Sequence, residues 1–362
     1  MSNSTESFSE ANRFGWDYES AGAALPSLPF PIWDVHSHLS GARAAHVMKR
    51  VMDLFGIERI YSMSQPEELA ALRDVLGDRI RFIATPDFRS KDRQSALAGG
   101  YARRLRQFAT EGVRIAKFWS APRGVDFAEQ FGAPGDSFRL NTPHVQANMG
   151  LAVELGMHIM VHISDPDTWF ATHYSDSTRY GDKLSQYVAF EEAMDRFPVP
   201  FIAAHLGGWP ENLEFLSGLL SRHDQLYLDT SATKWMVREL SRHSVQERQS
   251  FFERWSHRLL FGSDIVTRDS HLSPGGSEAE DLKSSSDSEA FDLYASRYWA
   301  LRTLFETDYH GESPIADPDL SLVEPDKYTQ TDAPPLIGSL TPTHVLRCIY
   351  YQTPHALLSP LD

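Results

Sequence analysis

The sequence predicts a (β/α)8 barrel, because short apolar or β-branched runs alternate with stretches of helical hydrophobic spacing. Eight runs are candidate strands: residues 30–38, 57–63, 80–85, 113–119, 158–163, 201–206, 226–229 and 259–264. A chain of 362 residues is long for one domain, but barrels of this kind commonly reach such a length. A doubly wound open sheet is the alternative, and the lack of a Gly-x-Gly-x-x-Gly turn after the first run weighs against it.

Between the candidate strands, apolar residues recur every three or four positions, which predicts helices that cover the barrel. These stretches are residues 44–55, 66–76, 96–110, 143–155, 183–197 and 212–221, followed after the last strand by 291–306 and 343–358.

Three segments depart from this alternation. Residues 1–29 predict a flexible N-terminal tail ahead of a barrel domain at 30–362. The Ser-, Gly- and acid-rich segment 270–289 predicts a mobile loop. The proline- and acid-rich segment 311–342 predicts an irregular C-terminal excursion.

The first apolar run ends in two histidines, His36 and His38, separated by one residue. Side chains two apart on a strand point to the same face, so both imidazoles are expected on one side of the strand's carboxyl end. Two imidazoles in that arrangement can share one metal ion. The pair is also compatible with two polar residues where a strand runs into a loop, since short motifs recur by chance.

Polar or aromatic side chains also mark the ends of four later strands, at the rim where a barrel builds its active site. They are Lys117 and Trp119 for the fourth strand, His162 and Asp165 for the fifth, His205 for the sixth and Asp264 for the eighth. Burying an imidazole or a carboxylate there is unfavourable without a partner. A metal ion suits several neutral imidazoles and one carboxylate, which predicts a metal site.

Together these motifs resemble the amidohydrolase superfamily, in particular its amidohydrolase-related branch of metal-dependent hydrolases, lactonases and decarboxylases of aromatic and enoic acids. The resemblance spans about residues 30–264, with a weaker echo at 350–358. It depends on Asp34-Val35-His36-Ser37-His38, Val161-His162, Ala204-His205-Leu206-Gly207-Gly208 and Leu260-Phe261-Gly262-Ser263-Asp264.

Two other families also begin with His-x-His on a barrel strand, but they fit less well. TatD-type nucleases carry a glutamate on the fourth strand, where this chain has Lys117. The polymerase and histidinol phosphatase family tends to end in Asp-x-His, where this chain has Asp264-Ile265-Val266.

The resemblance implies a role for several residues of these motifs. His36, His38, His162 and Asp264 are implied as ligands of one divalent ion, with zinc expected. Asp264 and His205 are implied as the catalytic residues. Lys117 is expected to be unmodified and to bind substrate or pair with an acid. The alternative is a carboxylated Lys117 that bridges a second metal ion.

Around the rim we expect a substrate pocket with aromatic walls and one or two cations, which suits a flat or unsaturated carboxylate. The candidate substrate-binding residues are Lys117, Trp119, Arg123, Asp165, Trp169, Trp235 and Arg268.

Three functions remain open at this stage. The first is hydrolysis of an amide, lactone or ester bond in a small carboxylate-bearing molecule by a metal-activated water. The second is non-oxidative decarboxylation of an aromatic or enoic acid at the same metal site. The third is a barrel that binds without catalysing, which is disfavoured because every expected ligand position is filled.

The composition narrows the expected partners and compartment. The net charge of −15 disfavours binding to nucleic acid or to anionic lipid, so a small-molecule substrate is expected. With Cys348 alone, no intrachain disulfide can form, which fits a reducing compartment. The N-terminal sequence lacks the pattern of a secretory signal and no run of eighteen apolar residues occurs, so we expect a cytoplasmic protein. A homo-oligomer is possible by analogy with the family.

Overall fold

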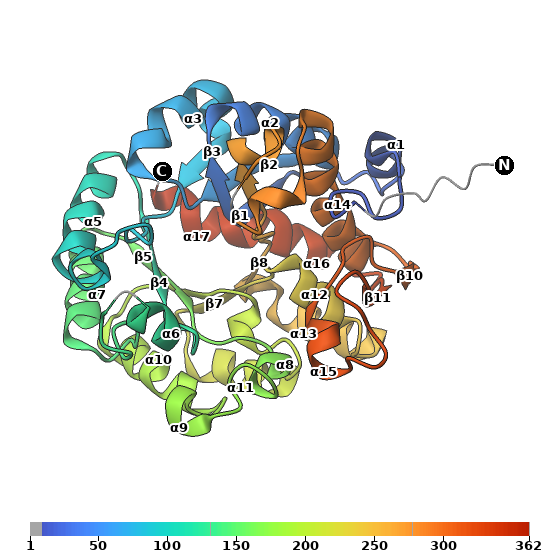
Figure 1. Ribbon diagram of the computed structural model, residues 1–362. Helices are drawn as coiled ribbons and strands as arrows, with labels where there is room; N and C mark the ends of the chain where they lie inside the picture. Colours follow the sequence, from blue (N-terminus) through green and yellow to red (C-terminus); the bar gives the residue numbers. More distant parts are fainter. Residues whose placement is uncertain (1–8, 131, 277, 362) are drawn as a thin grey trace.

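The eight candidate strands all form, and their parallel pairing makes the wall of a barrel that Figure 1 shows end-on. The computed structural model describes residues 9–130, 132–276 and 278–361. The strands are β1 (Ile32–Ser40), β2 (Ile57–Ser62), β3 (Ile80–Phe82), β4 (Ile115–Trp119), β5 (His158–His162), β6 (Phe201–Ala203), β7 (Leu226–Asp229) and β8 (Leu259–Leu260).

Two seams close the ring of strands. Neighbouring strands pair in chain order from β1 to β3 and from β4 to β8, and a parallel bridge between Ala84 and Ala116 joins the two sets. At the other seam, the Val35 amide donates to the Phe261 carbonyl at 2.9 Å. A short strand, β9 (Val266–Arg268), then extends the eighth strand and pairs in parallel with β1. The predicted (β/α)8 barrel is therefore confirmed.

The predicted helices form close to their expected bounds and lie outside the barrel (Figure 1). In α2, for example, the buried residues recur at helical spacing and face the strands. The covering helices are α2 (Ala42–Phe55), η1 (Pro66–Glu68) with α3 (Leu69–Leu76), η3 (Ala96–Gly100) with α5 (Tyr101–Thr110), α7 (Pro143–Glu154), α10 (Ser185–Arg196), α11 (Leu213–Arg222) and α13 (Val245–Trp255).

Shorter helices occupy the connections on the carboxyl side of the strands and beside the barrel. They are α4 (Arg93–Ser95), α6 (Gly124–Glu129), α8 (Asp167–Phe170), α9 (Ser177–Tyr180), η4 (Leu206–Gly208) and α12 (Thr233–Leu240), with the turns η2 (Gly77–Arg79) and η5 (Ser256–Arg258) before β3 and β8.

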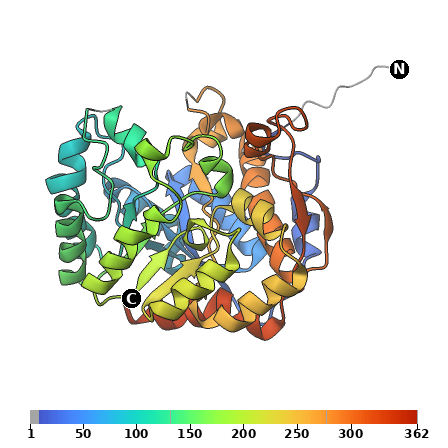
Figure 2. The same cartoon turned by 90° about the horizontal axis from the view of Figure 1, so that it is seen from below.

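The C-terminal helices close the amino-terminal end of the barrel, opposite the predicted site. α16 (Thr343–Arg347), η8 (Cys348–Gln352) and α17 (Thr353–Leu358) run together along that end (Figure 2). Leu357 and Leu358 pack into the barrel interior against Val35 and Trp33 of β1. Because this end is filled with apolar side chains, the carboxyl ends of the strands are left to form a cavity.

The segment expected as a flexible tail is packed for the part that the structure describes, residues 9–29. It contains α1 (Tyr18–Ala23), whose first turn is capped by the Asp17 carboxylate. Tyr18 is buried, and Trp16 packs edge-on against Trp299 of α14 (Asp287–Glu306) at 4.9 Å between ring centroids. Aromatic burial against α14 holds this stretch in place, so a free tail is wrong for these residues. Residues 1–8 lie outside the described part of the chain.

The segment 270–289 is irregular, but its last three residues already belong to α14. It holds two single turns, η6 (Asp269–Leu272) and η7 (Asp281–Lys283). The buried His271 ties it to the barrel, since its Nδ1 lies 2.9 Å from the Tyr294 hydroxyl and its Nε2 lies 3.0 Å from the Glu280 carbonyl. The mobility expected for this loop stays a prediction.

The excursion at 311–342 is mostly irregular, with two short ordered pieces. β10 (His310–Glu312) and β11 (Pro335–Ile337) pair as an antiparallel ribbon, and α15 (Asp319–Val323) lies between them. The buried Arg238 of α12 pairs with the Asp317 carboxylate at the start of α15, which brings this excursion to the carboxyl end of the barrel.

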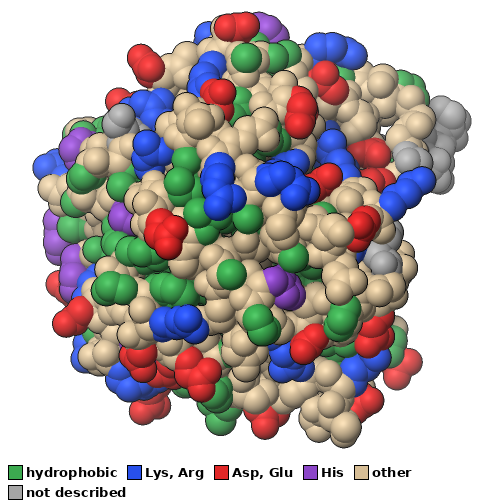
Figure 3. Space-filling model, turned by 90° about the vertical axis from the view of Figure 1, so that its left-hand side faces the viewer, with side chains coloured by type: hydrophobic (Ala, Val, Ile, Leu, Met, Phe, Trp, Pro, Cys, Tyr) green, Lys and Arg blue, Asp and Glu red, His purple; other side chains and the backbone are tan. Residues whose placement is uncertain are grey.

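The surface carries charges of both signs. On the face drawn in Figure 3, acidic and basic side chains are interspersed with hydrophobic ones. Among the described residues, no helix is both long enough and apolar enough to span a lipid bilayer.

Candidate functional site

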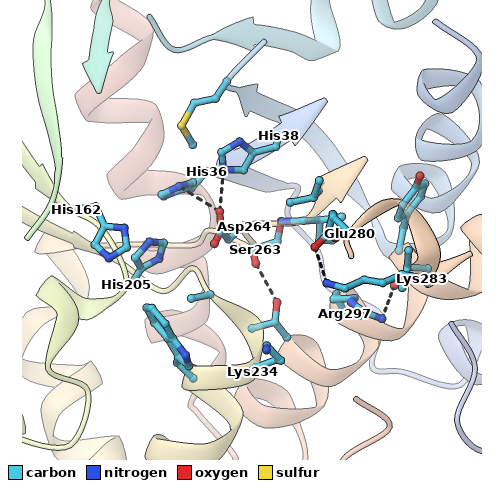
Figure 4. Close-up of a pocket in the computed structure, with 18 of the residues that line it drawn as sticks. His36, His38, His162, His205, Lys234, Ser263, Asp264, Glu280, Lys283 and Arg297 are labelled. Atoms are coloured by element: carbon cyan, nitrogen blue, oxygen red, sulfur yellow. Dashed lines mark hydrogen bonds and ion pairs between the residues drawn. The ribbon is translucent and has the colours of Figure 1, made fainter. Parts of the chain in front are cut away.

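The carboxyl ends of the strands surround a cavity of about 520 Å³, drawn in Figure 4. The predicted site residues that line it share a position at or just after a strand end. They are His36, His38, Lys117, Trp119, His162, Trp169, His205, Trp235 and Asp264. Most of the residues that were predicted at the rim therefore line one cavity.

His36, His38 and Asp264 form one of two clusters of potential metal-ligand atoms among the described residues, and His36, His205 and Asp229 form the other. Potential ligand atoms within each cluster all lie within 4.8 Å of one another. The Asp264 Oδ1 atom is 3.0 Å from His38 Nε2 and 3.4 Å from His36 Nε2. The alternation of β1 places both imidazoles on one face, as the His-x-His spacing predicted. Two imidazoles and a carboxylate at this separation are a donor set that suits a divalent metal ion.

The backbone at the strand ends is bent to aim these side chains. Asp264 and His205 both have positive φ angles, 59° in each case, and both lie in the short turns that follow β8 and β6. The Asp264 amide donates to the His36 carbonyl at 2.7 Å, which fixes the carboxylate beside β1. Non-glycine residues in this conformation are uncommon and cluster at functional sites.

Gly208 shows why the His205 motif ends in glycine. Its φ angle is +76°, and a Cβ atom there would lie 2.1 Å from the Ser164 carbonyl oxygen. A larger residue would push the turn after β6 away from β5, so glycine is required for His205 to reach the cavity.

Asp229 orients His36 from below the cavity. Its Oδ2 atom lies 2.8 Å from His36 Nδ1, and both side chains are buried. Burial alone would raise the pKa of Asp229, but the charge and hydrogen bond of His36 hold it far below its usual range. The ionised Asp229 therefore accepts a hydrogen bond from His36 Nδ1–H. The proton stays on Nδ1, so the lone pair of Nε2 is directed toward Asp264.

Ser231 sets the tautomer of His205 in the same way. The Ser231 hydroxyl donates its single proton to Asp229, so it can only accept from His205 Nδ1, which lies 2.7 Å away. His205 Nε2 then has a free lone pair on the cavity side. Burial and the neighbouring His162 lower the pKa of His205 well below its usual value, so this imidazole is neutral.

Asp229 and Ser231 were missed by the sequence argument. Asp229 is the last residue of the seventh apolar run, the position that carries His162 on the fifth strand. That shared position was the available signal.

His162 lies beside His205, with 4.5 Å between the ring centroids, but its ligand atoms fall outside the clusters within 4.8 Å. Its Nε2 atom is 2.8 Å from Asp165 Oδ1, and the Tyr174 hydroxyl donates to Asp165 Oδ2 at 2.5 Å. Asp165 thus holds His162 with Nδ1 as its free nitrogen. The role of His162 as a fourth ligand stays a prediction.

Lys117 is buried at the floor of the cavity, and its Nζ atom lies 3.3 Å from His36 Nε2. Burial lowers the pKa of Lys117 to about 8, although Asp229 and Asp264 act in the opposite direction. Within the described part of the chain, no carboxylate lies within 4.0 Å of this ammonium group. Lys117 is therefore a buried cation whose present acceptor is a histidine lone pair.

Comparison with protein families agrees with this arrangement. The family described as Amidohydrolase matches residues 33–359, which is most of the chain. The chain belongs to the amidohydrolase family. Among curated proteins, no match is found.

Several solved structures are similar to this amidohydrolase at low sequence identity. The 5-carboxyvanillate decarboxylase of Novosphingobium aromaticivorans, complexed with manganese and 4-hydroxy-3-methoxy-5-nitrobenzoic acid, is 12% identical with a TM-score of 0.40, over 74% of this chain and 90% of that one. Uronate isomerase from Thermotoga maritima is 9% identical with a TM-score of 0.44, over 86% of this chain and 69% of that one. D-psicose 3-epimerase in the presence of D-fructose is 15% identical with a TM-score of 0.40, over 74% of this chain and 97% of that one.

Tryptophan rings form one wall of the amidohydrolase cavity. Asp319, at the start of α15, accepts hydrogen bonds from the indole nitrogens of Trp169 at 2.9 Å and Trp235 at 3.2 Å. Because both N–H groups are taken, the two rings present only apolar surface to the cavity, and Trp119 adds a third. The excursion at 311–342 therefore builds part of the pocket.

Three candidate substrate-binding residues lie outside the cavity lining. Arg123 is exposed and sits over the Trp169 ring at 5.7 Å. Arg268 pairs with Glu278 at 2.6 Å and with Asp281 at 3.2 Å. Asp165 is occupied by His162 and Tyr174. A strand-end location was a poor guide here, because nearby polar groups already bind Arg268 and Asp165, and Arg123 lies in solvent over an indole ring.

Other charged residues line the cavity instead: Lys234, Glu280, Lys283 and Arg297, together with Glu10 from the N-terminal segment. None of the five is among the predicted site residues. Glu10, Glu280 and Lys283 lie on segments outside the alternation of strands and helices, and Lys234 and Arg297 lie on α12 and α14.

Proposed function

We propose that this amidohydrolase is a metal-dependent decarboxylase that removes CO2 from an aromatic or enoic carboxylic acid. The observation that carries the proposal is the position of Lys117. Its ammonium donates to the lone pair of His36 Nε2, which is directed toward Asp264. A bound metal ion would occupy the same lone pair. The buried ammonium then requires a new acceptor, and a substrate carboxylate beside the metal ligands supplies one.

The metal ligands in this proposal are His36, His38, Asp264 and His162. One metal ion is expected, because a Lys117 that is not carboxylated cannot bridge two metal ions. Zinc and manganese both suit imidazole and carboxylate donors. When bound, the ion would supply Lewis acidity toward the oxygen atoms of the substrate.

The protein's own groups divide the remaining work. Lys117 neutralises and orients the carboxylate, and the tryptophan wall stacks against a flat substrate and excludes water. The bond between the carboxyl carbon and its neighbour breaks, the electron pair stays on the neighbour, and one proton replaces the departing CO2. Asp264 is ionised and His205 Nε2 is free, so either group can first accept a proton from solvent or from a substrate hydroxyl and then deliver it to that carbon.

Hydrolysis of an amide, lactone or ester is the second candidate, and the charge state of Asp264 favours it. Burial alone would raise the pKa of Asp264, but the hydrogen bond from His38 and the surrounding imidazoles hold it far below its usual range. A carboxylate that stays ionised is suited to accept a proton from an attacking water.

A single assay separates the two candidates. Protein loaded with zinc or manganese is incubated with hydroxybenzoates, enoic acids, lactones and anilides, and the products are weighed by mass spectrometry. The proposal expects loss of the mass of CO2 from a carboxylic acid, abolished in D264N and strongly reduced in K117M. Gain of the mass of water, with no loss of CO2 from any acid, would contradict decarboxylation and support hydrolysis. An exposed substitution on α5, R106Q, serves as the control and should leave turnover unchanged.

A further inference from the structure

The side of the cavity away from the histidines is rich in cations. Lys234 of α12, Lys283 of η7 and Arg297 of α14 all line it, and we call these three residues the cationic wall. In Figure 4, Lys283 and Arg297 lie to one side of Asp264, and His162 and His205 lie to the other. Lys283 and Arg297 are therefore separate from the cluster that suits a metal ion, and Lys234 lies below Asp264 in this view.

Arg297 has no acidic partner of its own. Within the described part of the chain, its hydrogen bonds use only Nη1, which donates to the Leu293 carbonyl at 3.0 Å and to the Ser296 hydroxyl at 2.8 Å. Among the described residues, no carboxylate lies within 4.0 Å of its guanidinium. Burial lowers the pKa of Arg297, and the nearby carboxylates of Glu280 and Glu10 offset this effect only in part. Its remaining N–H groups are free to bind a ligand.

The other two cations leave positive charge available as well. Lys283 pairs with Glu280 at 2.6 Å, but Lys234 forms no ion pair within the described residues. The acids nearest to Lys234, Asp317 and Asp319, are already bound by Arg238. The acids that line the cavity near the wall are Glu280 and Glu10, so three cations face two carboxylates.

A purely structural set of cations is expected to be paired, because an uncompensated buried charge is costly. An arginine with unused donors on a cavity wall is instead the usual means of binding a planar carboxylate through two hydrogen bonds. Lys234 is placed to add a second charge to such a ligand.

We propose that the cationic wall binds a second carboxylate of the substrate, at the end opposite the carboxylate that is held beside Lys117. The substrate of this amidohydrolase is then a dicarboxylic acid with its two acid groups on one flat or unsaturated frame. This inference depends on the proposed function for the first carboxylate only. Arg297 and Lys234 determine specificity for the second.

The test measures binding to the full-length, zinc-loaded protein by titration calorimetry. The probes are benzoate, isophthalate and terephthalate, with 3-carbamoylbenzoate and 4-carbamoylbenzoate as analogues of equal shape that lack the second charge. A charge-assisted pair contributes enough for at least one dicarboxylate to bind about tenfold to a hundredfold more tightly than its carbamoyl analogue. R297Q is expected to remove that preference and K234Q to reduce it, whereas R106Q should preserve it. 3-Phosphonobenzoate shows whether the wall accepts a phosphonate as readily as a carboxylate.

The inference is overturned if both dicarboxylates bind no more tightly than their carbamoyl analogues, or if R297Q keeps the wild-type preference. The proposed function fails in a different way: benzoate would bind equally with and without metal, and K117M would not weaken it. The two results can be read separately, because the first compares charges at the far end and the second compares metal states at the near end.

Discussion

Asp229 and Ser231 determine which nitrogen of each neighbouring histidine carries the proton. Asp229 accepts from His36 Nδ1, and Ser231 accepts from His205 Nδ1 while donating to Asp229. Both histidines therefore direct a bare Nε2 toward the cavity. At the scale of single residues, this network prepares His36 to bind a cation and His205 to receive a proton.

Replacement of Ser231 by alanine tests that network. Loss of the hydroxyl leaves His205 Nδ1 without its acceptor, so the ring is expected to sample both neutral tautomers. One hydrogen bond contributes roughly 1 kcal/mol, so kcat/KM should fall about fivefold to tenfold. Nitrogen NMR of labelled histidines should show His205 protonated mainly at Nδ1 in the wild type and at both nitrogens in S231A. A single unchanged tautomer in S231A would reject the assignment, and the exposed substitution S221A serves as the control.

The two long segments after the barrel strands form much of the pocket at the scale of elements. The excursion at 311–342 holds Trp169 and Trp235 through Asp319, and the segment 270–289 supplies Glu280 and Lys283. The residues proposed to select the substrate thus lie on segments that do not take part in closing the barrel.

Substitution D319A is expected to release both indole rings at once. The tryptophan wall should then lose its fixed orientation, raising KM about tenfold with a smaller change in kcat. Steady-state kinetics and tryptophan fluorescence measure the two consequences. E324Q, an exposed acid on the same excursion, should change neither. Unchanged KM and fluorescence in D319A would show that Asp319 does not position the wall.

The attachment of segment 270–289 should depend on pH through His271. Burial lowers the pKa of His271 below its ordinary value of 6.5, so the locally unfolded segment binds a proton more readily than the folded one. The stabilisation is complete above pH 6.5 and is lost as the pH falls below it. Hydrogen exchange of residues 278–286, corrected for intrinsic rates, should show less protection at about pH 5.5 than at about pH 7.5. Equal protection at both pH values would contradict this, and H271Q should remove the difference.

At the scale of the whole molecule, the barrel was predictable because each strand and helix has its own hydrophobic periodicity in the sequence. Runs such as 226–229 and 158–163 carry their own periodicity, and the order of strands follows from chain order in a barrel. The packing of Tyr18 and Trp16 on α14 was not predictable, since it joins segments about 280 residues apart.

The site was predictable to the same extent as its strands. His36, His38 and Asp264 come together because the ends of β1 and β8 are adjacent in any closed barrel. Arg297 lies in a helix beyond the barrel strands, and only tertiary structure shows that it faces the cavity. Local pattern therefore predicts the candidate metal ligands better than the charged residues on the other side of the cavity.

Metal binding should stabilise the entire barrel, because the ligands come from strands at both sides of its closing seam. Zinc at a hundred times its Kd is expected to add about 2.7 kcal/mol to the free energy of unfolding. Differential scanning calorimetry should show a Tm higher by roughly 5 °C than in excess chelator. In D264A this difference should largely disappear. An equal increase in wild type and D264A would place the stabilising metal elsewhere.

Metal content combined with anomalous diffraction tests the central claim most directly. Crystals of zinc-loaded protein should contain one metal ion per chain, with its anomalous peak about 2.0–2.2 Å from His36, His38 and Asp264. The double variant H36A/H38A should retain less than a tenth of that metal. A wild-type protein without stoichiometric metal, or with its peak away from these three side chains, would contradict the account.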